Sequence, residues 1–265
     1  MPEPTQTAER VNVICLKWGE RYPADYVNRL YRSVTRHLRR PHRFVCFTEN
    51  PAGLDGGIDA IPLDRITVDE TLRNDIFLKV AAIHSVSGLA GPTLFLDLDV
   101  VILGSLDEFF DYEPDKFCII HNWLPKRKTL FRGLPDVGNS SVFRFTPGRC
   151  DHVLDKFLAD PHHARTAYPT EQAFLTDCMT GGRCYWPDGW TRSFKRHAMR
   201  LFPLNLVLKP KLDLGTKVLV FHGRPDPDQA IAGFRDSPRK SSRPLPELAT
   251  HWGWCYCPAQ AGGCG

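Results

Sequence analysis

Short apolar runs alternate with amphipathic helical patterns over the first third of the chain. The runs at 11–16, 44–47 and 58–63 predict buried strands, and apolar residues at three- and four-residue steps over 26–38 predict a helix. A second helix is predicted over 77–86. Strands that alternate with helices in this way indicate a mostly parallel central sheet flanked by helices, and such sheets bind ligands beyond the carboxyl ends of their strands.

The next apolar run, 93–102, is interrupted only by Asp97 and Asp99. In one continuous strand these two side chains would project the same way, at the carboxyl end where ligands bind. Two like charges repel each other and lose hydration there, so we interpret the pair as a site for a hard divalent metal, with coordination positions left open for a substrate phosphate. The alternative is an ordinary strand end with two solvated aspartates.

The remainder of the chain continues the α/β pattern. Strands are predicted at 117–120, 141–145 and 218–222, and a helix is predicted to begin at Glu171. We therefore expect a single Rossmann-like α/β domain over residues 1–236. Proline, serine and arginine become dense after this point, so residues 237–265 are expected to form a basic tail that contains cysteine and glycine.

Charge is nearly balanced over the whole chain but concentrated locally. The 265 residues carry a formal net charge of +4, with basic residues gathered at 126–132, 192–200 and 235–243. Such clusters suit phosphate-bearing ligands or peripheral contact with an anionic membrane surface, although solvated loops are the commoner explanation. No recognised nucleic-acid-binding motif accompanies them, so we expect no nucleic-acid partner.

Hydropathy and cysteine usage indicate a cytoplasmic protein. No apolar segment approaches the length of a membrane span, and residues 1–10 do not resemble a signal peptide. Cys15, Cys46 and Cys118 lie in apolar runs, where reduced thiols pack as small hydrophobes, so no disulfide framework is expected. The tail has the donor types of a zinc site but no Cys-x-x-Cys pair, which favours a flexible thiol-bearing segment; these donors are His251, Cys255, Cys257 and Cys264.

Five separated segments resemble motifs of the metal-dependent glycosyltransferases of the GT-A fold, in particular the glycogenin and bacterial lipopolysaccharide galactosyltransferase family. They are IFLKV at 76–80, LFLDLDVV at 94–101, GNSSV at 138–142, TEQA at 170–173 and FHGRP at 221–225. Each motif alone is weak, and their order and spacing carry the likeness. The chain departs from the family pattern at Ser141, Glu171 and Arg224, where the family has a glycine, an aspartate and a more distant lysine.

The resemblance implies an enzyme that transfers a sugar from a nucleotide-diphosphate donor, with UDP-sugar favoured, to a glycan, glycolipid or protein acceptor. It implies that Asp97 and Asp99 bind Mn²⁺ or Mg²⁺ against the donor diphosphate, and that His222 is the third metal ligand. An imidazole nitrogen is an acceptable ligand for such an ion. For a single histidine at a strand end, the alternative is a hydrogen-bonded structural residue.

The candidate donor-binding residues combine stacking surfaces, cations and paired hydrogen-bonding groups. Aromatic rings would accept the base and ribose, basic side chains the phosphates, and amide or hydroxyl groups the sugar. These candidates are Trp18, Tyr22, Arg73, Lys79, Asn139, Ser140 and Arg224.

The catalytic candidates are Asp136, Glu171 and Gln172. Gln172 can both donate and accept hydrogen bonds to sugar hydroxyls, and either carboxylate can orient the acceptor or take its proton. The resemblance favours retention of configuration, in which the leaving phosphate accepts that proton and no dedicated base is required. An inverting enzyme would need a base, with Asp136 or Glu171 in that role.

Two other functional classes fit parts of the sequence. A phosphatase of the haloacid-dehalogenase type also carries Asp-x-Asp on a hydrophobic strand, but there the motif opens the fold, and here it follows several strand and helix units. A non-catalytic scaffold of the same fold would bind a nucleotide or glycan. The presence of both aspartates together with His222 argues against that scaffold.

Overall fold

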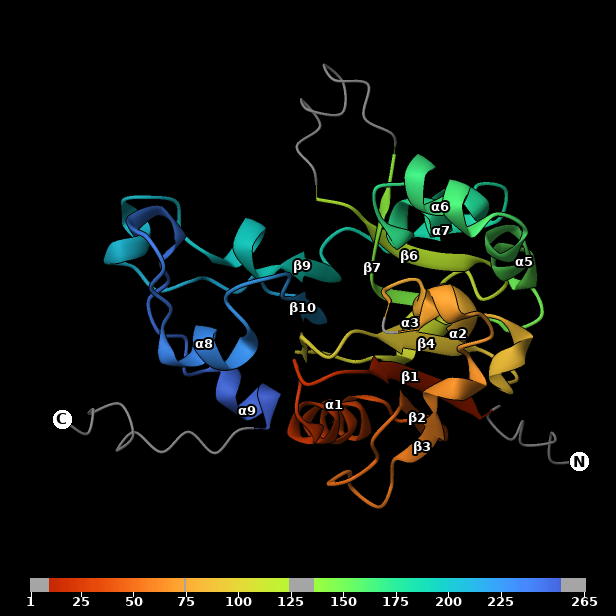
Figure 1. Cartoon of the computed structure of the whole chain (residues 1–265). Helices are drawn as coiled ribbons and strands as arrows, with labels where there is room; N and C mark the ends of the chain where they lie inside the picture. Colours follow the sequence, from red (N-terminus) through yellow and green to blue (C-terminus); the bar gives the residue numbers. More distant parts are fainter. Residues whose placement is uncertain (1–9, 74, 124–135, 254–265) are drawn as a thin grey trace, which may run out of the picture.

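A seven-stranded sheet with helices on both faces forms the centre of the molecule (Figure 1). The structure is a computed structural model that describes residues 10–73, 75–123 and 136–253. The strand order is β3-β2-β1-β4-β7-β6-β8. The strands are β1 Val11–Lys17, β2 His42–Thr48, β3 Asp59–Pro62, β4 Thr93–Leu96, β6 Phe117–His121, β7 Gly138–Phe145 and β8 Arg183–Tyr185.

One strand of this sheet runs against the other six. Strand β7 is antiparallel to both of its neighbours, β4 and β6, whereas the other pairs are parallel. The carboxyl ends of β1, β4 and β6 therefore lie at the same edge as the start of β7. The expectation of a mostly parallel α/β sheet is confirmed, and this edge is where such a sheet binds ligands.

The alternation of side chains along β1 shows why both faces of the sheet are covered. Val13 and Cys15 pack with α1 and α3, whereas Ile14 and Leu16 pack with α2, α5 and α7 on the opposite face. The helices are α1 Ala24–His37, α2 Leu78–Ala82, α3 Asp107–Asp111, α5 Asp151–Ala159, α6 Pro161–Ala167, α7 Glu171–Cys178, α8 Pro227–Ala232 and α9 Leu248–Trp252. The predicted helix 77–86 is shorter than expected, because a separate 3₁₀ turn follows α2 at Ser85–Ser87.

The segment that carries the two aspartates is not one strand. Strand β4 ends at Leu96, residues 97–99 form a turn, and the chain then enters a second sheet of order β5-β10-β9. The strands of this sheet are β5 Val100–Ile102, β9 Thr191–Ser193 and β10 Val218–Val220. The expectation that Asp97 and Asp99 project from a single strand is therefore wrong, although they do follow the carboxyl end of β4. The prediction failed because the apolar character of a segment does not distinguish one long strand from two short strands of different sheets.

The predicted domain boundary at residue 236 differs from the observed packing. Leu245, Leu248 and Trp252 are buried in a cluster with residues of the second sheet, and Ser33 of α1 donates a hydrogen bond to the carbonyl of His251. Residues 237–253 thus complete the fold instead of forming a tail. The three tail cysteines, Cys255, Cys257 and Cys264, lie outside the described residues. The basic cluster at 126–132 also lies outside them.

Cysteine chemistry differs from the expectation at one position. Cys15 and Cys46 are buried free thiols, as predicted, but Cys118 of β6 forms a disulfide with Cys184 of β8. The two cysteines are directly paired in the parallel register of these strands. No helix in the described part of the chain is both long and apolar enough to cross a bilayer.

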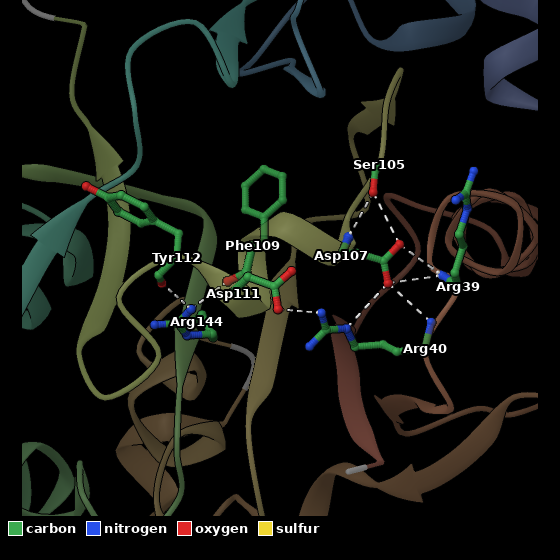
Figure 2. Close-up of polar contacts among 8 residues, drawn as sticks. All are labelled: Arg39, Arg40, Ser105, Asp107, Phe109, Asp111, Tyr112 and Arg144. Atoms are coloured by element: carbon green, nitrogen blue, oxygen red, sulfur yellow. Dashed lines mark hydrogen bonds and ion pairs between the residues drawn. The ribbon is translucent and has the colours of Figure 1, made fainter. Parts of the chain in front are cut away.

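The five-residue helix α3 depends on tertiary contacts at both of its ends (Figure 2). At its start, the Asp107 carboxylate accepts hydrogen bonds from the backbone N–H groups of Arg39 and Arg40, each at 3.2 Å. Beyond its end, the buried guanidinium of Arg144 on β7 donates to four backbone carbonyls, those of Phe109, Tyr112, Glu113 and Lys116. The helix therefore links the turn between α1 and β2 to the central sheet.

Arg144→Leu would leave these four carbonyls without their donor, and that of Phe109 is buried. We expect the free energy of unfolding to fall by about 1–3 kcal/mol, the cost of a buried polar group that loses its partner. Urea denaturation measures this loss. Arg149→Leu is the matched control because Arg149 forms an exposed pair with Asp115, and equal effects of the two substitutions would contradict the assignment.

Asp107→Asn tests the other end of α3. Burial alone would raise the pKa of Asp107, but the N–H groups of Arg39 and Arg40 and the Arg40 guanidinium together hold it below its usual value. Such a carboxylate stabilises the fold above its unfolded-state pKa of about 4, and this stabilisation is lost as the pH falls through the folded-state pKa.

We therefore expect Asp107→Asn to reduce the free energy of unfolding by about 1–2 kcal/mol at neutral pH, with the difference from wild type shrinking in acid. Thermal or urea unfolding across pH measures this dependence. Asp115→Asn, at an exposed ion pair, serves as the control. A difference that stays constant from neutral pH to below the folded-state pKa would show that the charge of Asp107 is not responsible.

Candidate functional site

Two cavities meet at the sheet edge formed by the ends of β1, β4 and β6. The first, of about 310 Å³, lies between the residues that follow β1 and the turn 97–99. The second, of about 360 Å³, lies between the start of β7, the start of α7 and the residues that follow β6. Ile76, Lys79 and Asp97 line both cavities and form their common wall.

The first cavity combines aromatic side chains with the two predicted carboxylates. Trp18 and Tyr22 line it together with Asp97 and Asp99. The Tyr22 hydroxyl donates a hydrogen bond to Oδ2 of Asp99 at 3.1 Å, which holds the carboxylate in place. Burial and the nearby charge of Asp97 raise the pKa of Asp99 to about 7, although the Tyr22 hydroxyl, Lys79 and Arg21 oppose the shift.

The buried Lys79 supplies a positive charge to the common wall. Nζ of Lys79 lies 2.7 Å from Oδ1 of Asp97 and 3.7 Å from Oε1 of Glu171. It also donates hydrogen bonds to the carbonyl and hydroxyl oxygens of Ser140, both at 3.3 Å. Burial acts against the charged form, but Asp97 and Glu171 outweigh it and raise the pKa of Lys79. The lysine thus joins α2 to the turn after β4, to β7 and to α7.

Amide and hydroxyl groups line the second cavity. Asn139, Ser140, Glu171 and Gln172 all contribute to it. Thr170 caps α7 by accepting a hydrogen bond from the N–H of Ala173, which brings the first residues of the helix to the edge of the sheet. The cavity therefore presents several donors and acceptors in a small volume, as the recognition of sugar hydroxyls requires.

His222 lies in the second cavity with Asp97. Its Nε2 lies 2.7 Å from Oγ of Ser193, and its ring stacks against Trp123 with the ring centres 6.2 Å apart. Burial, together with the positive charges of Lys195 and Arg196, holds the pKa of His222 below its usual value. These surroundings favour the uncharged form of the ring.

The donor set is only partly that of a metal centre. Asp97 and Asp99 line one cavity, and two carboxylates leave most coordination positions to water and phosphate oxygens, as Mg²⁺ and Mn²⁺ sites commonly do. Within residues 10–73, 75–123 and 136–253, however, no three Asp, Glu, His or Cys side chains form a metal-binding group. The carboxylate pair fits a divalent ion, whereas Nε2 of His222 is hydrogen-bonded to Ser193.

Three other candidates lie away from both cavities. Asp136 accepts hydrogen bonds from the Tyr185 hydroxyl and the Arg183 guanidinium and contacts His121. Arg73 is exposed and pairs with Glu70. Arg224 is also exposed. None of the three lines either cavity.

The structure adds three residues that the sequence reasoning did not single out. Arg21 lines the first cavity, and its guanidinium lies 4.8 Å from the Tyr22 ring centre. Trp123 and Arg196 line the second. Trp123 could have been predicted from the sequence. It lies two residues beyond the carboxyl end of β6, and that end belongs to the ligand-binding edge of the sheet. Arg196 comes from a π-helix, Phe194–Ala198, whose placement depends on the second sheet.

The comparisons with known sequences found no relative. No protein-family model matches the chain, and no curated protein is significantly similar to it.

The fold has clear counterparts among solved structures. The galactosyltransferase LgtC, in complex with donor and acceptor sugar analogues, matches with a TM-score of 0.54 and 15% identity over 82% of this chain and 88% of LgtC. The bifunctional glycosyltransferase WbbM matches with a TM-score of 0.55 and 13% identity, covering 85% of this chain and 48% of WbbM.

GlyE of Streptococcus pneumoniae TIGR4 is another glycosyltransferase with this fold. It matches with a TM-score of 0.52 and 13% identity over 83% of this chain and 56% of GlyE. The resemblance seen in the sequence is thus confirmed at the level of the fold: the chain has the GT-A architecture of glycosyltransferases.

Proposed function

We infer that this chain is a glycosyltransferase that moves a sugar from a nucleotide-diphosphate donor, with a UDP-sugar favoured, to a glycan, glycolipid or protein acceptor. The observation that carries this inference is the common wall between the two cavities. One cavity offers aromatic rings and the carboxylate pair, the other offers hydroxyl and amide groups, and Asp97 lines both. The binding of donor and acceptor sugar analogues by LgtC, which has the same fold, is consistent with it.

In this proposal the first cavity binds the nucleotide diphosphate. Trp18 and Tyr22 provide flat surfaces for the base and ribose, and Arg21 adds a cation at the cavity wall. Asp97 and Asp99 would hold Mn²⁺ or Mg²⁺, which when bound would offset the charge of the departing diphosphate. Lys79 remains paired with Asp97 and Glu171 and so keeps Asp97 in position.

The second cavity would position the transferred sugar and the acceptor hydroxyl. Gln172 and Asn139 line it and can pair with sugar hydroxyls. Glu171 is buried, and Oε1 accepts a hydrogen bond from the Ser140 hydroxyl while facing Lys79. A carboxylate held in this way is a poor proton acceptor for an incoming hydroxyl, and Asp136 lies outside the cavity. These placements favour retention, in which the leaving phosphate takes the acceptor's proton.

Nucleotide binding provides the first test. Calorimetric titration of UDP into the purified protein is expected to show binding with Mn²⁺ present and none with EDTA, and GDP is expected to bind more weakly. Asp99→Asn should lower the metal-dependent affinity about 10- to 100-fold, since it removes a ligand of the ion.

The control for this titration is Asp64→Asn, because Asp64 is exposed and lies outside both cavities. Its affinity for UDP should equal that of the wild type, and both variants should keep the wild-type unfolding temperature. Absence of binding to either nucleotide in the presence of metal would remove the basis of the proposal.

Transfer itself is tested at Gln172. Because Gln172 lines only the second cavity, Gln172→Ala should slow UDP release from a panel of UDP-hexoses at least about tenfold, the cost of one lost hydrogen bond in the transition state. Its affinity for UDP should remain that of the wild type. Wild-type protein that binds UDP but releases none from any donor, with or without candidate acceptors, would instead identify a nucleotide-binding scaffold.

A further inference from the structure

An unusual concentration of exposed apolar side chains lies outside the two cavities. Of the ten large hydrophobic residues that are exposed in the described chain, seven lie between residues 201 and 214. The exposed fraction reaches 84% at Leu201, 71% at Val207 and 103% at Leu214. Figure 1 shows this part of the chain at the left end of the molecule, away from the seven-stranded sheet. A concentration of exposed apolar side chains of this kind is typical of an interaction site in a globular protein.

The backbone holds these side chains in their outward positions. Asn205 is buried within a 3₁₀ turn, and its Nδ2 donates to the carbonyl oxygens of Pro238 and Ser241 at 2.8 and 2.9 Å. Nε of Arg200 donates to the carbonyl of Lys209 and joins the two ends of the segment 201–208. The apolar residues on both sides of Asn205 are therefore exposed by an ordered loop.

Basic residues surround the apolar surface. Residues 195–214 and 235–247 contain nine lysines and arginines but only three aspartates and glutamates. Each of the three acidic residues has a basic partner: Asp213 pairs with Arg192, Asp236 with Lys240, and Glu247 with Lys209. Among the described residues, five exposed basic residues of these two ranges form no ion pair. Besides Arg196 of the second cavity, they are Lys211, Arg235, Arg239 and Arg243.

A cavity connects the apolar and basic parts. It measures about 410 Å³, and Leu206 lines it together with Arg235, Arg243, Asp236 and three serines. The Asp236 carboxylate is paired with Lys240. Two guanidinium groups beside an exposed leucine match the phosphate of a lipid headgroup at the boundary with its acyl chains.

We propose that residues 200–214 and 235–243 form a docking surface for an anionic phospholipid membrane, and we call it the membrane-docking surface. Its leucines, Phe202 and Val207 enter the boundary between headgroups and acyl chains, and its arginines and lysines contact lipid phosphates. A second copy of this chain fits less well, because two surfaces with the same excess of positive charge repel each other. The proposal goes beyond sugar transfer and does not depend on it.

The position of the membrane-docking surface also bears on the acceptor. Arg196 lines the second cavity, and the π-helix that carries it ends at Ala198, three residues before Leu201. If the proposed transferase activity is correct, docking therefore brings that cavity near the bilayer, as a lipid-linked acceptor would require.

Vesicle sedimentation with the full-length chain tests the docking surface. We expect binding to vesicles of phosphatidylcholine with about 30% phosphatidylglycerol to exceed binding to pure phosphatidylcholine at least about tenfold at low salt, and to weaken at high salt because the charge contribution is screened. Equal binding to both vesicle types, or no binding to either, would overturn the proposal.

Two combined variants separate the apolar and basic contributions. Leu201→Ser/Val207→Ser/Leu214→Ser and Arg235→Gln/Arg239→Gln/Arg243→Gln should each lower binding to the anionic vesicles at least about tenfold. The matched control is Val68→Ser/Leu158→Ser, which alters exposed apolar residues outside this surface and should bind like the wild type.

Unfolding temperature and UDP titration show whether each variant retains its fold and its first cavity. Lost vesicle binding with unchanged nucleotide binding therefore concerns the membrane-docking surface alone. Light scattering without vesicles provides the remaining comparison. If the wild type associates with itself and the serine variant does not, the surface is an interface between copies of this chain and the membrane proposal is wrong.

Discussion

The candidate site depends on the charge balance of three carboxylates held largely out of water. Asp97, Asp99 and Glu171 come from two separate segments and lie within or beside the two cavities. Dehydration of such groups is costly unless partners compensate for it. Lys79 faces Asp97 and Glu171, and the Tyr22 hydroxyl supports Asp99. The ammonium group of Lys79 thereby links α2 to α7, to β7 and to the turn after β4.

The route of the backbone through residues 97–99 explains why the two cavities share a wall. The N–H of Asp97 donates to the carbonyl of Ser141 on β7, and the carbonyl of Asp99 accepts from the N–H of Phe221 after β10. The turn is therefore bonded to the first sheet at one end and to the second sheet at the other. Asp97 therefore lines both cavities, whereas Asp99 lines the first alone.

The second sheet and the C-terminal helices form a distinct layer of the molecule. Val101 and Leu219 pack with α8 and α9, and Trp252 is buried among them. This layer supports the π-helix that supplies Arg196 to the second cavity and the apolar loop that follows it. A short sequence motif such as Asp-x-Asp describes none of this layer, yet the layer supplies Arg196 and His222 to the second cavity.

The sequence by itself determined the alternation of strands and helices, the mostly parallel sheet and the location of Asp97 and Asp99 at the ligand-binding edge of that sheet, because these follow from local periodicity of burial. Only the tertiary structure decided that the aspartates occupy a turn between two sheets, that Cys118 pairs with Cys184, and that Asp136 and Arg224 lie outside both cavities. Those outcomes depend on contacts between segments far apart in the chain, and the hydropathy of a segment does not specify its distant partner.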